Sequence, residues 1–249
     1  MTNSWGGMLN KKDTVVVILA AGRGRRLRPL TDNTPKPLLK LNDKTIIEHQ
    51  VESCKKLGLK NIVIVVGYQK DKIKRIVGNS VKYVENKEYS NSKPGYSMWL
   101  ARSYLKNKSL LHMLGDTYFD FELLKKLVNS KYPNALLVDF GAKLNKEAAK
   151  VYIKNGLVRK INKSIPLNKA SGEDIGLRKF SKEFTKELFK RLDESVKKNR
   201  KNIFMHSKVS QIANKLPIHP ISTKGYKCIE IDTIEDYENA KKILHNRRN

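Results

Sequence analysis

Short runs of β-branched and other apolar residues recur along the first half of the chain. They occupy residues 14–19 (TVVVIL), 62–66 and 110–114. Continuous apolar runs of this length are typical of strands buried on both faces of a parallel sheet. The three segments therefore predict central strands of an α/β sheet.

Helical patterns fill the intervals between these runs. Thr45 and Glu48 form a capping-box pattern, and apolar positions then recur at helical spacing until Gly58 ends the helix. We further expect a short strand over residues 81–84 and a helix opened by Ser97. A strand that is followed by a helix and a second strand predicts a right-handed βαβ unit.

The alternation continues with a helix capped by Asp120 and a strand over residues 135–140. It predicts fold class α/β, with a doubly wound, mostly parallel, Rossmann-like sheet. Residues 143–180 do not continue this alternation of strands and helices. Two short strands there flank Asn155-Gly156, a strong hairpin signal. This segment predicts a small β-rich subregion.

The last third of the chain returns to the α/β pattern. We expect an amphipathic helix through Phe184 and Val196, a strand over residues 226–231 and a final helix capped by Thr233. We interpret residues 1–249 as one domain. Residues 1–12 are expected to be flexible, and Met8 is an alternative start of the native chain.

The composition of the chain limits the classes of function that it can serve. The chain carries 51 Lys and Arg against 24 Asp and Glu, a formal charge of +27. Such a charge can serve nucleic-acid binding, but the basic residues are dispersed and form no zinc-finger or aromatic-basic motif. We therefore favour a solvated surface that attracts small anionic substrates, and nucleic acid is not an expected partner.

Localisation follows from what the sequence lacks. No apolar run is long enough to cross a bilayer, and the opening residues have no apolar signal core. We expect a cytoplasmic protein without membrane insertion, in which Cys54 and Cys228 are reduced thiols. The sequence leaves open whether the chain forms a homo-oligomer.

A glycine-rich basic loop follows the first strand. It lacks the closing Gly-Lys-Ser/Thr of a Walker loop, and position 27 is leucine where a dinucleotide fingerprint requires glycine. Gly22 and Gly24 allow backbone N–H groups to approach a base or phosphate. Arg26 offers a fixed cationic fork and Lys36 a mobile point charge, so the two could neutralise a departing pyrophosphate.

Carboxylates follow two of the predicted strands. Asp116 comes directly after the strand that ends at residue 114, and Glu230 and Asp232 share one face at the end of the last strand. Ligands in open α/β sheets bind outside the carboxyl ends of strands. Hard oxygen ligands suit Mg²⁺, so Asp116 and Asp232 predict a magnesium site. Glu230 is an additional candidate that could instead pair with surface lysines.

The segment LAAGRGRRLRPLTDNTPKPLLKL over residues 19–41 resembles the signature of nucleotidyltransferases that activate phosphorylated sugars and alcohols. Further motifs resemble the phosphocholine cytidylyltransferase-like branch: Asn86, YSMWLA, LGDTYFD, SGEDIG and EIDTIEDYENA. One segment departs from the branch, because SKPG over residues 92–95 stands where paired asparagines are usual.

The resemblance implies a nucleotide-diphospho-sugar transferase-like fold and roles for individual residues. Metal ligation carries over to Asp116 and Asp232. Nucleotide binding is implied for Leu19, Ala20, Ala21, Gly22, Gly24, Arg26, Lys36, Asn86 and Ser97. On the acceptor side, Glu173 and Gly176 are expected in the pocket wall, Lys163 opposite the acceptor phosphate and Lys150 as a second cation. The ring of Trp99 could face an ammonium group, although a core position is the more common one.

Taken together, these features predict a Mg²⁺-dependent nucleotidyltransferase. An ionised phosphate or phosphonate oxygen would attack the α-phosphorus of a nucleoside triphosphate, with Arg26, Lys36 and Lys163 as the catalytic cations. No general base is needed, so none of the histidines is assigned to catalysis. CTP with phosphocholine, 2-aminoethylphosphonate or inositol phosphate is favoured. A thymidylyl- or uridylyltransferase that makes a nucleotide sugar is the first alternative, and a non-catalytic nucleic-acid-binding protein the second.

Overall fold

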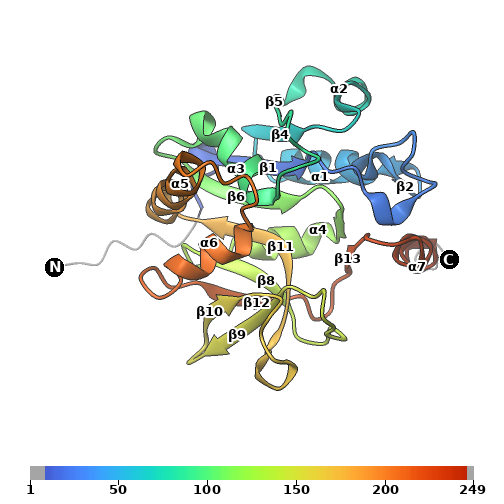
Figure 1. Ribbon diagram of the computed structural model, residues 1–249. Helices are drawn as coiled ribbons and strands as arrows, with labels where there is room; N and C mark the ends of the chain where they lie inside the picture. The colour runs from blue at the N-terminus through green and yellow to red at the C-terminus, as the bar shows by residue number, and fades with distance from the viewer. Residues whose placement is uncertain (1–8, 246–249) are drawn as a thin grey trace.

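A computed structural model describes residues 9–245 of the chain. Its centre is a large twisted sheet in which β1 (Thr14–Ala20) lies between β4 (Ile62–Val66) and β6 (Ser109–Leu114) and runs parallel to both (Figure 1). β5 (Lys82–Glu85) extends this parallel part beyond β4. The predicted α/β class with a mostly parallel central sheet is confirmed, and the buried apolar runs are its inner strands.

Antiparallel strands complete the other side of the sheet. β11 (Gly172–Phe180) pairs antiparallel with β6 and with β8 (Ala135–Asp139), and β12 (His219–Ser222) lies parallel beside β8. β9 (Lys150–Lys154) and β10 (Leu157–Ile161) form the outer hairpin. The segment predicted to be β-rich therefore consists of this hairpin and of β11, which continues into the main sheet.

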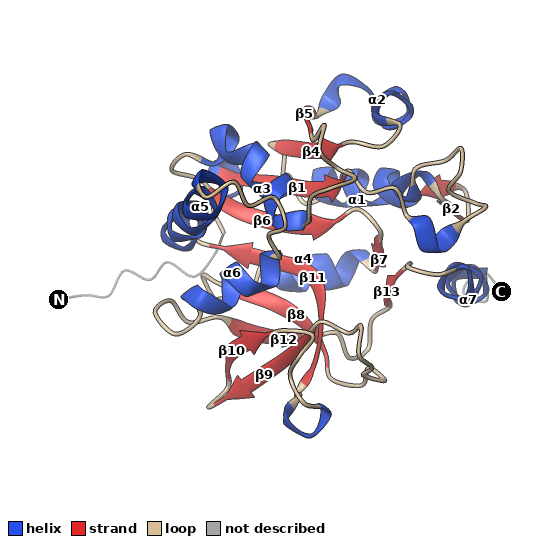
Figure 2. Ribbon diagram, in the orientation of Figure 1, coloured by secondary structure: helices blue, strands red, loops and turns tan. Residues whose placement is uncertain are grey.

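The helices cover both faces of the sheet (Figure 2). One face carries α1 (Ile46–Lys56), α2 (Lys70–Val77) and α4 (Phe121–Val128). The opposite face carries α3 (Pro94–Leu100), α5 (Lys182–Lys197) and α6 (Met205–Ile212). Within residues 9–245, no helix is long and apolar enough to cross a membrane. Single 3₁₀ turns span Lys11–Asp13, Arg25–Leu27, Lys36–Leu38, Gly78–Ser80, Ala101–Leu105 and Leu167–Lys169.

The C-terminal helix α7 (Ile234–His245) stands apart from these layers. It belongs to a third hydrophobic cluster, which contains Leu27, Leu39, Leu41, Ile46, Ile231, Ala240 and Leu244. The loop after β1, with the small hairpin β2 (Lys40–Leu41) and β3 (Lys44–Thr45), thus packs against the end of the chain. A further pair of short strands, β7 (Thr117–Phe119) and β13 (Cys228–Glu230), lies between the sheet and α7.

The element boundaries differ from expectation in a few places. α3 begins at Pro94 rather than Ser97, because Lys93 is still extended and a proline suits the first helical turn. The strand expected over residues 226–231 shortens to β13, since a turn around Gly225 precedes it. The elements α2, α6 and β12 were not anticipated.

The predicted flexible start is only partly described. Met8 and the residues before it lie outside the described residues, and the Lys11–Asp13 segment forms a 3₁₀ turn. The Thr45 capping box is present, with both reciprocal hydrogen bonds. Cys54 and Cys228 are free thiols, as expected.

Candidate active site

Three carboxylates meet where β6 ends. β7 pairs antiparallel with β13, which brings Glu230 opposite Thr117, and the Ile231 N–H donates to the Asp116 carbonyl at 3.0 Å. One carboxylate oxygen from each of Asp116, Glu230 and Asp232 lies within 4.8 Å of the other two. Residues more than a hundred positions apart therefore form one compact oxygen cluster.

A buried amide fixes the turn that carries Asp116. Gln50, on α1, is fully buried and donates from Nε2 to the carbonyls of Leu114 (2.8 Å) and Thr117 (2.7 Å). These two carbonyls lie on either side of the turn, so the amide links both ends of it to the helix. The position of Asp116 is thus fixed by hydrogen bonds from Gln50 to the backbone on either side of it. The Asp116 side chain takes no part in these bonds.

Two cations from the glycine-rich loop contact the carboxylates. The Lys36 Nζ donates to Asp116 Oδ2 at 2.8 Å and to Asp232 Oδ1 at 2.5 Å. The Arg26 Nη2 donates to the second Asp232 oxygen at 2.6 Å. The Lys36 side chain is only 10% exposed whereas that of Arg26 is 58% exposed, so Lys36 is the interior cation and Arg26 the outer one.

Burial and neighbouring charges shift the pKa values of this cluster in different directions. Burial opposes the charged form of Lys36, but Asp116 and Asp232 outweigh it and raise its pKa. Burial likewise opposes ionisation of Asp232, and Lys36 with Arg26 still lowers its pKa. For Glu230, burial first, and then the two aspartates, outweigh the opposing charge of Lys36 and raise its pKa to about 8. A divalent cation would offset this surplus of negative charge.

The donor set fits a hard divalent ion. Asp116 Oδ1 is buried and makes no hydrogen bond, although it lies in the cluster with the other carboxylates. Carboxylate oxygens at this spacing are the ligands that Mg²⁺ prefers. The residues that could hold the ion are Asp116, Asp232 and Glu230.

The glycine-rich loop is packed closely around Lys36. Gly24 has a positive φ of 68°, and a Cβ on it would lie 3.1 Å from the Lys36 Cβ. The Thr31 hydroxyl donates to the Gly24 carbonyl at 2.8 Å and closes the loop. Glycine at position 24 is therefore required by both backbone conformation and space.

A hollow of about 400 Å³ surrounds these groups at the carboxyl end of β1. The loop, the end of β6, the start of α3 and Asp232 line it together. Its lining residues are Leu19, Ala20, Gly22, Gly24, Arg25, Arg26, Lys36, Pro37, Lys93, Pro94, Gly115, Asp116 and Asp232. This is the position at which open α/β sheets bind their ligands.

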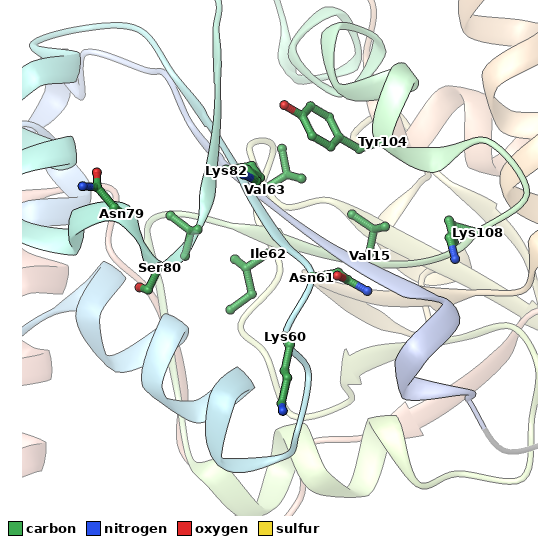
Figure 3. Close-up of a pocket in the computed structure, with 11 residues that line it drawn as sticks. Val15, Lys60, Asn61, Ile62, Val63, Asn79, Ser80, Lys82, Tyr104 and Lys108 are labelled. Atoms are coloured by element: carbon green, nitrogen blue, oxygen red, sulfur yellow. The ribbon is translucent and has the colours of Figure 1, made fainter.

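A second hollow, of about 340 Å³, lies at the opposite, amino-terminal ends of β1 and β4. Figure 3 shows Tyr104 and Lys108 on one side of it and Asn79 and Ser80 on the other. Its described lining contains lysines, asparagines and valines but no carboxylate. Of these two hollows, the first combines cations with the candidate metal ligands Asp116 and Asp232.

Comparison with known proteins assigns the fold and the site to a family. Residues 16–174, more than half of the chain, match the family model described as MobA-like NTP transferase domain. The chain belongs to this family. It is an enzyme of the nucleotidyltransferase class, and the family generally uses a divalent metal ion.

Relatives of this NTP transferase are named as cytidylyltransferases or related transferases. A choline-phosphate cytidylyltransferase of Streptococcus pneumoniae is 29% identical over 92% of this chain and 98% of its own length. A bifunctional IPC transferase and DIPP synthase of Aquifex aeolicus is 32% identical over 92% of this chain, which spans only 51% of that protein. A solved structure of a CTP:phosphocholine cytidylyltransferase from S. pneumoniae is 26% identical, with a TM-score of 0.75 and coverage of 93% and 99%.

Not every residue named from the sequence reaches the hollow of this NTP transferase. Leu19, Ala20, Gly22, Gly24, Arg26 and Lys36 line it. Ala21 is buried in the core beside this lining. Asn86 and Ser97 are buried too, and the Asn86 amide donates to the Ser97 hydroxyl at 2.9 Å. These two side chains hold α3 to the loop after β5 and are absent from the described lining.

The acceptor-side candidates are dispersed. The Trp99 Nε1 donates to Asp193 on α5 at 2.6 Å, so its indole is engaged in packing between helices. Lys150 is 2% exposed and donates to the Asn145 carbonyl at 2.9 Å. A Cβ on Gly176 would collide with Leu114, behind the turn of Asp116. None of these three residues is in the described lining of the hollow.

Glu173 and Lys163, the other two acceptor-side candidates, are likewise outside the described lining of the hollow. Burial raises the pKa of Glu173, and the charge of Glu173 in turn contributes to the raised pKa of Glu230. Lys163 is exposed and pairs with Glu147 at 2.8 Å. This contact lowers the pKa of Glu147.

Five residues of the described lining were not assigned to the site from the sequence: Arg25, Pro37, Lys93, Pro94 and Gly115. Lys93 and Pro94 lie in the segment where SKPG departs from the branch, so that departure was the available signal for these two.

Proposed function

We propose that the chain transfers a cytidylyl group from CTP to a small phosphorylated or phosphonylated alcohol or amine, with Mg²⁺ as the metal and release of pyrophosphate. The observation that carries this proposal is the contact of Lys36 with two of the three clustered carboxylates. The same hollow thus offers a metal site and a cation for phosphate oxygens. The names of the relatives support CTP and the class of acceptor.

The chemistry requires alignment more than proton transfer. The acceptor oxygen is already an anion at neutral pH, so it can attack the α-phosphorus without a general base. A divalent ion on Asp116, Asp232 and Glu230 would neutralise charge on the phosphates. Arg26 and Lys36 would hold the departing pyrophosphate, and Lys163 would attract the acceptor anion toward it.

The nucleotide would enter over the open face of the glycine-rich loop. A Cβ on Gly22 would meet no atom within 4 Å, so the backbone there is accessible to a base or phosphate. Lys93, at the opposite side of the hollow, adds a cation that the triphosphate could reach. The binding of a metal-bound triphosphate explains why acidic and basic groups share one site, which a bare polyanion such as RNA would not require.

The test is pyrophosphate release from CTP, UTP, dTTP and ATP, each with phosphocholine, 2-aminoethylphosphonate, inositol 1-phosphate and glucose 1-phosphate. We expect the highest kcat/KM with CTP and one of the first three acceptors. We also expect loss of turnover with EDTA and its recovery with added Mg²⁺. Preference for UTP or dTTP with glucose 1-phosphate would instead establish the nucleotide-sugar alternative.

A further inference from the structure

A continuous path of hydrogen bonds joins helix α1 to helix α7 through the backbone of the carboxylate cluster. It starts at Gln50 on α1, which donates to the carbonyls of Leu114 and Thr117 at 2.8 and 2.7 Å. The Asp116 carbonyl, between these two, accepts the Ile231 N–H at 3.0 Å. This last bond connects the two strand ends that carry the candidate metal ligands.

The path ends at Asp236, in the first turn of α7. The Asp236 Oδ2 accepts the backbone N–H groups of Asp232 at 3.0 Å and Thr233 at 2.8 Å. The Asp236 N–H in turn donates to the Thr233 hydroxyl at 3.2 Å, so the helix begins with reciprocal bonds. The backbone of Asp232 is therefore fixed from α7, as that of Asp116 is fixed from α1.

The two residues at the ends of this path lie outside the hollow. Gln50 and Asp236 are both absent from its described lining. Gln50 is fully buried and both of its partners are carbonyls, so its amide acts there as a donor. Ile46 at the start of α1 belongs to the same hydrophobic cluster as Ala240 and Leu244 of α7. Both ends of the path therefore rest on one packed unit.

We infer that Gln50 and Asp236 are positioning residues of the metal site, which set the spacing of the Asp116 and Asp232 carboxylates before an ion binds. This inference rests on the divalent ion of the proposed function and adds two residues that lie behind its ligands. Mg²⁺ requires a nearly ideal arrangement of its oxygen ligands, so small shifts of a carboxylate weaken its binding. Loss of a residue that holds a metal ligand typically costs about tenfold to a hundredfold in metal affinity.

The two residues differ in charge, which allows positioning to be separated from simple attraction. Gln50 is neutral, so its replacement by leucine removes two hydrogen bonds without changing the charge near the ion. Asp236 is an acid, and a nearby negative charge by itself attracts a cation. Asp236→Asn loses the charge but keeps an oxygen acceptor for the two backbone N–H groups, whereas Asp236→Ala loses both.

The experiment measures the binding of Mn²⁺ alone to the full chain, by electron paramagnetic resonance of the free ion. Carboxylate sites that accept Mg²⁺ also accept Mn²⁺. We expect Gln50→Leu and Asp236→Ala each to weaken Mn²⁺ binding about tenfold or more. The Mg²⁺ concentration for half-maximal pyrophosphate release should rise by a similar factor. Asp236→Asn should bind Mn²⁺ nearly as tightly as the wild type.

Two control variants remove comparable contacts elsewhere. Cys54→Ala is matched to Gln50→Leu, because Cys54 is fully buried on the same helix and contacts Met113 within β6. Ser181→Ala is matched to Asp236→Ala, because the Ser181 side chain caps the first turn of α5. Both controls should lower the stability against urea and leave Mn²⁺ binding unchanged.

Several outcomes would overturn the inference. They are wild-type Mn²⁺ affinity in Gln50→Leu, equal losses in Asp236→Asn and Asp236→Ala, losses of the same size in the controls, or no Mn²⁺ binding to the wild type. If Gln50→Leu does not fold, the two Asp236 variants decide. The proposed function fails separately, if the wild type binds Mn²⁺ but releases no pyrophosphate from CTP with any acceptor.

Discussion

The regions that we assign to the nucleotide and to the acceptor, called here the nucleotide side and the acceptor side, use the same residue types differently. On the nucleotide side, Lys36 is almost buried and its ammonium group contacts carboxylates that face the hollow. On the acceptor side, the buried lysine is Lys150, and its ammonium group holds a backbone carbonyl. Burial alone therefore does not identify a functional cation, and the partner of the buried charge decides its role.

The two sides also differ in how their elements are connected. The loop with Lys36 follows β1 directly and lies between parallel strands, the usual ligand-binding edge of such sheets. The acceptor side is built from an outer hairpin and the antiparallel strand β11, which are joined by polar loops. We expect substitutions on the nucleotide side to reduce catalysis. Substitutions on the acceptor side should instead change the affinity for the acceptor or the stability of the fold.

The largest effect is expected for Asp116→Asn. It removes a negative charge from the carboxylate cluster but leaves Lys36 paired with Asp232, so the fold should persist. We expect kcat/KM to fall about a thousandfold, as for the loss of one preorganised charged contact or metal ligand. Steady-state kinetics across Mg²⁺ concentrations measures it. Asp71→Asn on α2 is the control, and a loss of less than tenfold for Asp116→Asn would contradict the assignment of Asp116.

The next effect compares the two acceptor-side lysines. Lys163→Met should raise the acceptor KM about tenfold to a hundredfold and leave the CTP KM unchanged, if this exposed lysine attracts the acceptor phosphate as we propose. Lys150→Met should instead lower the free energy of unfolding by about 1–3 kcal/mol, since the Asn145 carbonyl loses a buried donor. Urea unfolding and acceptor kinetics on both variants test this division, and the reverse pattern would break it.

The smallest effect concerns acid stability. Burial, together with Arg178, lowers the pKa of His206 to about 4 in the folded chain. The unfolded chain takes up that proton near pH 6.5, so unfolding is favoured as the pH falls from about 6.5 to 4. Fully buried His112 acts in the same direction. His206→Gln should reduce this pH dependence by up to one proton, and an unchanged slope would contradict the assignment.

The main strands and the carboxylate cluster were predictable because their signals are local. A strand of buried apolar residues determines where its carboxyl end lies, and Asp116 follows such an end directly. The loop residues Gly24, Arg26 and Lys36 could be placed for the same reason. In these segments, neighbouring residues in the sequence determine the geometry.

The acceptor side was less predictable, because the hydrogen-bond partners of its side chains lie far away in the sequence. Trp99 bonds to a carboxylate 94 residues later, and Ser97 is held by an asparagine from another loop. Lys150 and Lys163 look equivalent in sequence, yet one is buried and the other exposed. Tertiary packing determines which of these side chains is buried and which partner it contacts. No periodic pattern in the sequence indicates this.

The third hydrophobic cluster has a consequence for biosynthesis. Leu27 and Leu39, which flank Lys36 in sequence, pack together with Ile231, Ala240 and Leu244. Lys36 and Asp232 are 196 residues apart, so a growing polypeptide that has emerged only as far as the main sheet has one of the three clustered carboxylates, Asp116. The ribosome must therefore translate through α7 before this protein can engage its nucleotide, and a nascent chain cannot sequester substrate prematurely.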